Sequence, residues 1–302
     1  MLTAGMGAER DEMIRHFFLL GIAGLVLSLP VGAAPCTIRY FQQDARYAYR
    51  TALLQLVLDK TQEQGECSLS PQFTTVTPDR GLVLLQEGRI DVVSVPTTLQ
   101  REREMRAVRF DILRGLLGYR VLLIRKQQQA EFAAVRSLAE LRRFRLGFGS
   151  HWADLPLLQY NGFQVMATPR YESLFAMLAR GRFDAFPRGV NEAWQELAEQ
   201  QGSFPDLVVE PTLALHYPCP VYFFVRRDNQ ALAERLHLGL MRAQADGSLQ
   251  RLFMEYHGNL LQQANLAKRR LFFLSNPGLP PGTPKEDSRW WLPAAPSAAL
   301  DR

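Results

Sequence analysis

The sequence predicts an α/β protein made of two successive runs of alternating strands and helices. Its 302 residues, of which 47% are hydrophobic, can bury the cores of about two domains. Strand-like and helix-like segments alternate from residue 37, and the same alternation starts again after residue 116. This order of elements favours parallel sheets with right-handed crossovers.

The N-terminus has the pattern of a secretory signal peptide. Arg15 precedes an apolar run at 17–29, and small residues follow at 32–34. The run is about 13 residues long, whereas a membrane-spanning helix needs roughly 20. We therefore predict a signal peptide at residues 1–34, with Met13 as an alternative start, and a periplasmic mature protein.

Three cysteines, Cys36, Cys67 and Cys219, remain after cleavage, in what should be an oxidising compartment. Cys36 precedes the strand-like run 37–41, and Cys67 precedes a second such run that ends at Val76. If these are neighbouring parallel strands, both thiols lie at the same edge of the sheet. We predict a Cys36–Cys67 disulfide and a buried, unpaired Cys219.

The elements of the first run follow from apolar spacing and from the residues at helix ends. Thr77 is a suitable N-cap for a helix with Pro78 in its first turn, and Gly88 is suited to end that helix. The expected elements are strands at 37–41, 70–76 and 90–95 and helices at 44–60 and 78–87.

The second run begins with the long apolar segment 116–124. Ser137 and Glu140 have the spacing of a capping box. From Asn276 the chain is rich in proline and glycine, so residues 266–302 are expected to form a tail that lies on the surface. The other expected elements are strands at 145–148, 164–167, 183–186 and 221–225 and helices at 151–160, 171–180, 229–244 and 247–257.

Charge and motifs restrict the function classes. The formal net charge of +5 comes without a basic run, which suits an anionic ligand or simple solubility and argues against nucleic acid. No nucleophile elbow, phosphate loop or paired-cysteine metal spacing occurs, and the histidines are scattered. We expect a monomer that is not an enzyme and has no cofactor and no metal site.

Several segments together resemble bacterial extracellular solute-binding proteins of family 3, the amino-acid-binding type. They are "LLQEGRIDVV", "LLGYRVLLIRK", "SLAELRRFRLGFGS", "YESLFAMLARGRFDAF" and "YFFVRRDNQALAERL", in this order between residues 36 and 260. The resemblance implies a two-lobed, periplasmic-binding-protein-like (type II) fold with two chain crossovers. Lobe 1 is expected at 35–117 and 218–265, lobe 2 at 118–217, and a ligand between them.

The resemblance also implies first-lobe contacts to that ligand. Thr97 and Thr98 follow the strand that ends at Val95, in the loop where relatives place ligand-binding hydroxyl and N–H groups. Arg101 is the nearest match to the arginine with which relatives hold a carboxylate. Its alternative is a solvated residue in a charge cluster. Phe41, at the end of the first strand, is expected to supply an aromatic wall.

In the second lobe the resemblance implies contacts from the strand-to-helix turn at Gly149 and Ser150, with Trp152 at its rim. Arg188 stands where amino-acid binders usually carry an aspartate that pairs with the ligand ammonium group. A cation there favours a ligand with anionic character. The alternative for Arg188 is an ion pair with Glu192, four residues further on.

We therefore expect a periplasmic protein that captures a small polar ligand, anionic or amino-acid-like, for delivery to an ABC-type permease. The alternative is a ligand-sensing or partner-binding module that reports to a membrane sensor subunit. A dehydratase-like enzyme on the same fold is a weaker alternative. The transport and sensing functions are distinguished by whether the protein binds a permease or a sensor subunit.

Overall fold

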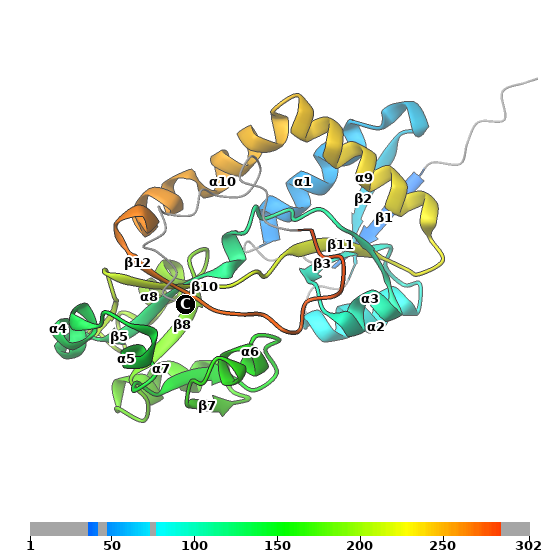
Figure 1. Cartoon of the computed structure of the whole chain (residues 1–302). Coiled ribbons are helices and arrows are strands. Elements are labelled where there is room, and N and C mark those ends of the chain that lie inside the picture. The colour runs from blue at the N-terminus through cyan, green and yellow to red at the C-terminus, as the bar shows by residue number, and fades with distance from the viewer. Residues whose placement is uncertain (1–35, 42–46, 73–76, 285–302) are drawn as a thin grey trace, which may run out of the picture. The chain divides into compact units, whose positions relative to one another are not determined.

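The computed structural model describes residues 36–41, 47–72 and 77–284 (Figure 1). The predicted signal peptide at 1–34 lies outside these residues. Among the helices that are described, none is both long and apolar enough to span a bilayer.

The predicted alternation of strands and helices is present in the first part of the chain. The strand expected at 70–76 begins at Cys67 instead, and a short helix and strand that the sequence analysis did not predict follow β3. The elements are β1 (Cys36–Tyr40), α1 (Ala48–Asp59), η2 (Gln62–Gln64), β2 (Cys67–Pro71), α2 (Pro78–Gln86), β3 (Val92–Pro96), α3 (Leu99–Glu104) and β4 (Arg106–Val108).

The middle of the chain repeats the alternation with shorter elements. These are η3 (Leu116–Gly118), β5 (Tyr119–Arg125), η4 (Lys126–Gln128), α4 (Gln129–Ala134), α5 (Leu138–Leu141), β6 (Leu146–Gly149), α6 (Leu155–Tyr160), β7 (Val165–Thr168), α7 (Tyr171–Ala179), β8 (Ala185–Gly189), α8 (Ala193–Gln200), β9 (Leu207–Val209) and β10 (Leu213–His216). The last elements are β11 (Val221–Val225), α9 (Gln230–Ala245), α10 (Ser248–Ala264), η5 (Leu266–Lys268) and β12 (Arg270–Phe273).

The strands form separate sheets; the chain crosses between them twice before α9 and returns to the larger sheet once more with β12. One sheet has the order β3-β11-β4, and β1 pairs with β2 in parallel nearby. The larger sheet has the order β12-β10-β5-β8-β6-β7, with β9 also paired to β5. The chain enters the larger sheet between β4 and β5 and leaves it between β10 and β11, which gives the two crossovers of the type II fold. We call β1–β4, β11 and their helices the first lobe, and the larger sheet with α4–α8 the second lobe.

The helices of the first lobe come from both ends of the chain. α9 and α10 follow the second crossover, yet they pack against α1 (Figure 1). Gly239 of α9 permits this close approach, because a Cβ atom there would lie 2.3 Å from the carbonyl oxygen of Val57. The buried side chains of Leu53 and Leu236 contribute to the core on this side of the sheet.

The segment expected to begin a surface tail at residue 266 instead contributes a strand. β12 runs parallel to β10, with Leu213 opposite Arg270 and His216 opposite Phe273. Without β12, β10 would be the edge strand and would leave its backbone groups unpaired. A four-residue run carries too little periodicity to be predicted, so this strand follows from tertiary pairing.

The predicted disulfide is present. Cys36 and Cys67 are register partners in β1 and β2, their Cα atoms are 4.4 Å apart, and their sulfur atoms are bonded. The remaining cysteine, Cys219, is buried and unpaired, as predicted. The parallel register thus explains why two thiols 31 residues apart in sequence meet.

We predict that replacing both Cys36 and Cys67 by serine lowers the free energy of unfolding by about 3–4 kcal/mol, because the disulfide closes a loop of this length in the unfolded chain. The melting temperature should fall by roughly 10 °C. Urea or thermal denaturation measures the change. Reductant should produce the same decrease in the wild-type protein and none in the variant; an unchanged melting temperature in reductant would contradict the prediction.

A second stability prediction concerns Arg269, which precedes β12. Its buried guanidinium group donates to the carbonyl oxygens of Ala264, Glu210 and Leu213. Replacement by alanine leaves these carbonyls without their charged donor, so we expect a loss of about 2–3 kcal/mol in unfolding free energy. The exposed neighbour Lys268 provides the control, because Lys268→Ala should change the denaturation midpoint very little.

Candidate functional site

A cavity of about 650 Å³ lies between the two lobes. The starts of α1 and α2 and the end of β3 line its first-lobe wall, and β5, the β6–α6 loop, α7 and the β8–α8 loop line its second-lobe wall. Three strands, β3, β6 and β8, therefore contribute residues at their carboxyl ends. Small ligands of α/β proteins bind at such strand ends, in cavities of this size.

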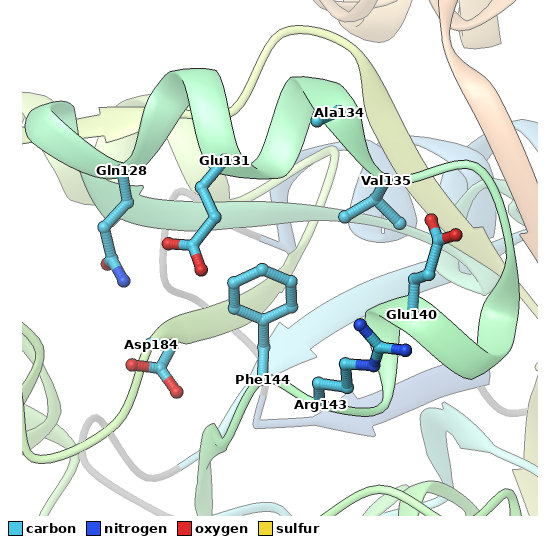
Figure 2. A pocket seen from close by; sticks show the side chains of 8 residues that line it. All are labelled: Gln128, Glu131, Ala134, Val135, Glu140, Arg143, Phe144 and Asp184. Atoms are coloured by element: carbon cyan, nitrogen blue, oxygen red, sulfur yellow. The ribbon is translucent and has the colours of Figure 1, made fainter.

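A second cavity, of about 400 Å³, lies within the second lobe beside α4 and α5, around the ring of Phe144 (Figure 2). Two of its three carboxylates have backbone partners. Asp184 accepts the N–H of Arg145 at 2.8 Å, and Glu140 accepts the N–H of Arg136 at 2.6 Å. Because this cavity lies within one lobe, away from the strand ends of β3 and β6, the cavity between the lobes is the better candidate site.

Arg188 reaches the site from β8 but is held by two glutamates. Its Nε and Nη2 atoms donate to the two carboxylate oxygens of Glu196 at 2.6 and 2.5 Å, and Nη2 lies 3.0 Å from Glu192 Oε2. The guanidinium carbon is 4.6 Å from the centre of the Trp152 ring. Burial alone would lower the pKa of Arg188, but the two carboxylates raise it above its ordinary value. The charge of Arg188 is therefore compensated within the protein.

The charge of Arg120, on β5, is also neutralised by a carboxylate of the second lobe. Its guanidinium group pairs with Asp154 and donates to the Tyr217 hydroxyl at 2.7 Å, and that hydroxyl donates to Asp154 Oδ2 at 2.6 Å. All three side chains are buried. The group joins the first crossover strand, the loop before α6 and the segment that leads back to the first lobe.

The first-lobe wall contains two arginines whose positive charges are less fully neutralised by carboxylates. Arg50 donates to the carbonyl oxygen of Ser94 at 3.0 Å, and Arg101 donates to that of Pro96 at 2.7 Å. The carboxylate nearest Arg101 is that of Asp79, at 3.8 Å and 73% exposed. Among the described residues, no carboxylate lies within 4 Å of Arg50. Burial lowers the pKa of both arginines, in contrast to Arg188.

Polar atoms of the second lobe converge at Gly189, where β8 ends. A Cβ atom on Gly189 would lie 2.7 Å from Asn191 Oδ1 and 3.0 Å from both Arg120 Nη1 and Glu192 Oε2. Asn191 lines the cavity, and its buried Oδ1 atom has no hydrogen-bond partner among the described residues. Burial alone would raise the pKa of Glu192, but Arg188 and Arg120 hold it below its ordinary value. The site thus offers a carboxylate and a free amide oxygen to a ligand donor.

Of the residues predicted to contact ligand, Arg101, Trp152 and Arg188 line the cavity. Thr97 and Thr98 do not line it. The Thr97 hydroxyl donates to Glu102, and the Thr98 hydroxyl accepts from the N–H of Arg101 as the cap of α3. Both threonines therefore fix the helix that carries Arg101.

Phe41, Gly149 and Ser150 are also absent from the cavity lining. Phe41 is 4% exposed and packs in the core beneath α2, where Gly81 lies against its ring. A Cβ atom on Gly149 would lie 2.5 Å from the Trp152 ring, so this glycine makes room for the indole. Ser150 is exposed. Phe41, which was expected to supply an aromatic wall to the ligand site, therefore belongs to the core instead.

The sequence analysis did not select Arg50, Arg120, Asn191 or Glu196 as site residues. Arg50 fell within a predicted amphipathic helix and carried no local motif. Glu196 lies eight residues after Arg188, beyond the turn into α8, so no helical spacing connects the two. These residues come together only in the tertiary structure. Of the contacts around Arg188, the sequence indicated just the ion pair with Glu192, as the alternative role of Arg188.

We predict that Arg188→Met and Glu196→Met each lower the free energy of unfolding by about 3–5 kcal/mol, because each leaves a buried charge without its bidentate partner. The double variant should lose clearly less than the sum of the two single losses. Urea denaturation of the four proteins measures this double-mutant cycle. Strictly additive losses would show that the pair does not interact in solution.

A model of bacterial extracellular solute-binding proteins, family 3, matches residues 50–259 of the chain. No curated protein sequence matches it. Solved structures share the fold at low identity. The probable amino-acid ABC transporter extracellular-binding protein YtmK from Bacillus subtilis has a TM-score of 0.55 and 15% identity, over 75% of this chain and 99% of that chain.

An ancestral arginine-binding protein bound to arginine has a TM-score of 0.52 and 17% identity, over 73% of this chain and 97% of that chain. The periplasmic VFT2 domain of BvgS from Bordetella pertussis has a TM-score of 0.53 and 16% identity, over 73% of this chain and 92% of that chain. At these identities the likeness concerns the fold.

Proposed function

Because the chain belongs to the bacterial extracellular solute-binding proteins of family 3, we propose that it captures an amino-acid-like zwitterion between its lobes and delivers it to an ABC-type permease. The family consists of solute-binding proteins and not of enzymes. The proposal adds the chemical class of the ligand, its orientation in the cavity and the membrane partner.

The opposite charges of the two cavity walls carry this proposal. Among the described lining residues, the first-lobe wall has two arginines and one carboxylate, a formal charge of +1, and the second-lobe wall has two arginines and three carboxylates, a formal charge of −1. The charged groups are Arg50, Arg101 and Asp79 on the first wall and Arg120, Arg188, Asp154, Glu192 and Glu196 on the second. A zwitterion gains Coulomb energy when its carboxylate faces the first wall and its ammonium group the second.

The ion pairs of Arg188 change the expectation drawn from the sequence. Arg188 was predicted to favour an anionic ligand by repelling an ammonium group. Since Glu192 and Glu196 neutralise it, that repulsion is removed, and Glu192 with the free Oδ1 of Asn191 supports binding of an ammonium group. Arg101 remains the proposed partner of the ligand carboxylate, through the N–H groups that do not contact Pro96.

The cellular setting of this proposal follows from the family and the N-terminus. The family is extracellular or periplasmic. We propose that the segment 1–34 directs export and that the mature protein binds its ligand as a monomer in the periplasm, without a cofactor.

A sensor subunit is the alternative membrane partner. The fold is shared by the BvgS periplasmic domain and by a histidine kinase sensor domain with a TM-score of 0.51 and 14% identity. Ligand-dependent cross-linking of the exported protein in its own cells tests the choice. Capture of a permease supports transport, and capture of a kinase supports sensing.

We predict that isothermal titration calorimetry of the exported protein against the twenty amino acids, including arginine, finds at least one ligand. Glu192→Gln should raise its dissociation constant by about 10–100-fold, because a hydrogen bond to a charged group contributes roughly 1.5–3 kcal/mol. Glu199→Gln, an exposed position on the same helix, serves as the control. If no amino acid binds, or if Glu192→Gln binds as the wild type does, the proposed ligand class is wrong.

A further inference from the structure

Two arginines stand at the free edge of β3, although one would suffice for a single carboxylate. β3 is the outer strand of its sheet, and Arg50 and Arg101 bind the carbonyl oxygens of Ser94 and Pro96. These carbonyls belong to residues two positions apart on one strand, so they project from the same edge at a spacing of roughly 6.6 Å. Two guanidinium groups are thereby held side by side, further apart than the two oxygens of one carboxylate.

Among the described residues, no carboxylate forms a close ion pair with either guanidinium group. Arg101 has a long contact to exposed Asp79, of a type that contributes little. Arg50 lies over the Tyr47 ring at 5.0 Å and donates to a carbonyl, and neither contact removes its charge. Burial lowers the pKa of both arginines, whereas the paired Arg120 has a pKa above its ordinary value. A partly buried cation in this condition is stabilised by a bound anion.

The opposite wall supplies groups for one cationic end of a ligand. Glu192 and Arg50 influence each other's pKa across the cavity, yet they form no direct ion pair within 4 Å. A ligand placed between them can therefore contact both. Asn191 Oδ1, a buried atom to which no described residue donates, adds a neutral acceptor beside Glu192.

We propose that Arg50 binds a second acidic group and thereby makes the site selective for amino acids with an acidic side chain. This inference rests on the proposed function. Such a ligand carries two anionic groups and one ammonium group, which correspond to Arg50, Arg101 and Glu192. A neutral amino acid would leave the partly buried Arg50 without an anion, and a basic side chain would place a second cation beside it.

The experiment compares L-glutamate, L-aspartate, L-glutamine and L-arginine by isothermal titration calorimetry with the exported wild-type protein. We expect an acidic amino acid to bind at least 10-fold more tightly than glutamine and arginine. If glutamine or arginine binds as tightly or more tightly, the inference about Arg50 falls while the proposed function stands. If none of the twenty amino acids binds, the proposed function falls with it.

Two variants and a control test whether Arg50 is responsible for the preference for an acidic ligand. Arg50→Gln should weaken binding of the acidic ligand by about 10–100-fold and change glutamine binding by less than about 3-fold. Arg101→Gln should weaken both ligands. Arg106→Gln removes an arginine that also donates to a backbone carbonyl, that of Arg227, outside the cavity, and should leave both affinities unchanged.

The melting temperature of each variant verifies folding. An Arg50→Gln protein that melts like the wild type and still prefers the acidic ligand by the wild-type ratio would overturn the inference. Equal weakening of the acidic and neutral ligands would also overturn it, because Arg50 would then act on the part that they share.

Discussion

The buried carboxylate of Asp111 joins the two segments that connect the lobes. It accepts the N–H groups of Leu113 and Gly115 in the first crossover and that of Val221 at the start of the returning strand, at 3.1, 2.6 and 3.0 Å. The Arg120, Asp154 and Tyr217 group joins the same two segments further into the second lobe. These buried hydrogen bonds hold the two crossover segments together.

The hydrogen bonds and ion pairs of the four cavity arginines determine which charges remain unneutralised at the cavity walls. Arg120 and Arg188 have most of their donors committed to carboxylates of their own lobe, so they shape the wall and orient Glu192. Arg50 and Arg101 donate to backbone carbonyls of β3, which fix their position without neutralising them. The difference between a charge paired with a carboxylate and a charge held by a carbonyl separates the framework of the cavity from the groups proposed to bind the ligand.

Sequence patterns predicted the elements well wherever the side chains repeat along one element. The strand at 221–225 and the helix that begins near 230 have the predicted positions, because apolar spacing reports burial directly. The cysteine pair followed from the placement of two strands in parallel. Phe41 and Thr97 show the limit of such reasoning. Each follows the end of a first-lobe strand, but the Phe41 ring packs in the core beneath α2 and the Thr97 hydroxyl donates to Glu102.

The sequence by itself determined the α/β class, since the alternation of strands and helices depends on periodicity and on residues close together in the chain. The crossovers, the segments that border the site, Arg101 and Trp152 came from the resemblance of several sequence segments to the family. Only the tertiary structure decided that Arg188 is neutralised by Glu196 and that Arg50 shares an edge of β3 with Arg101. It also placed β12 against β10. Each of these contacts joins separate elements, so its energy depends on distances that no local pattern encodes.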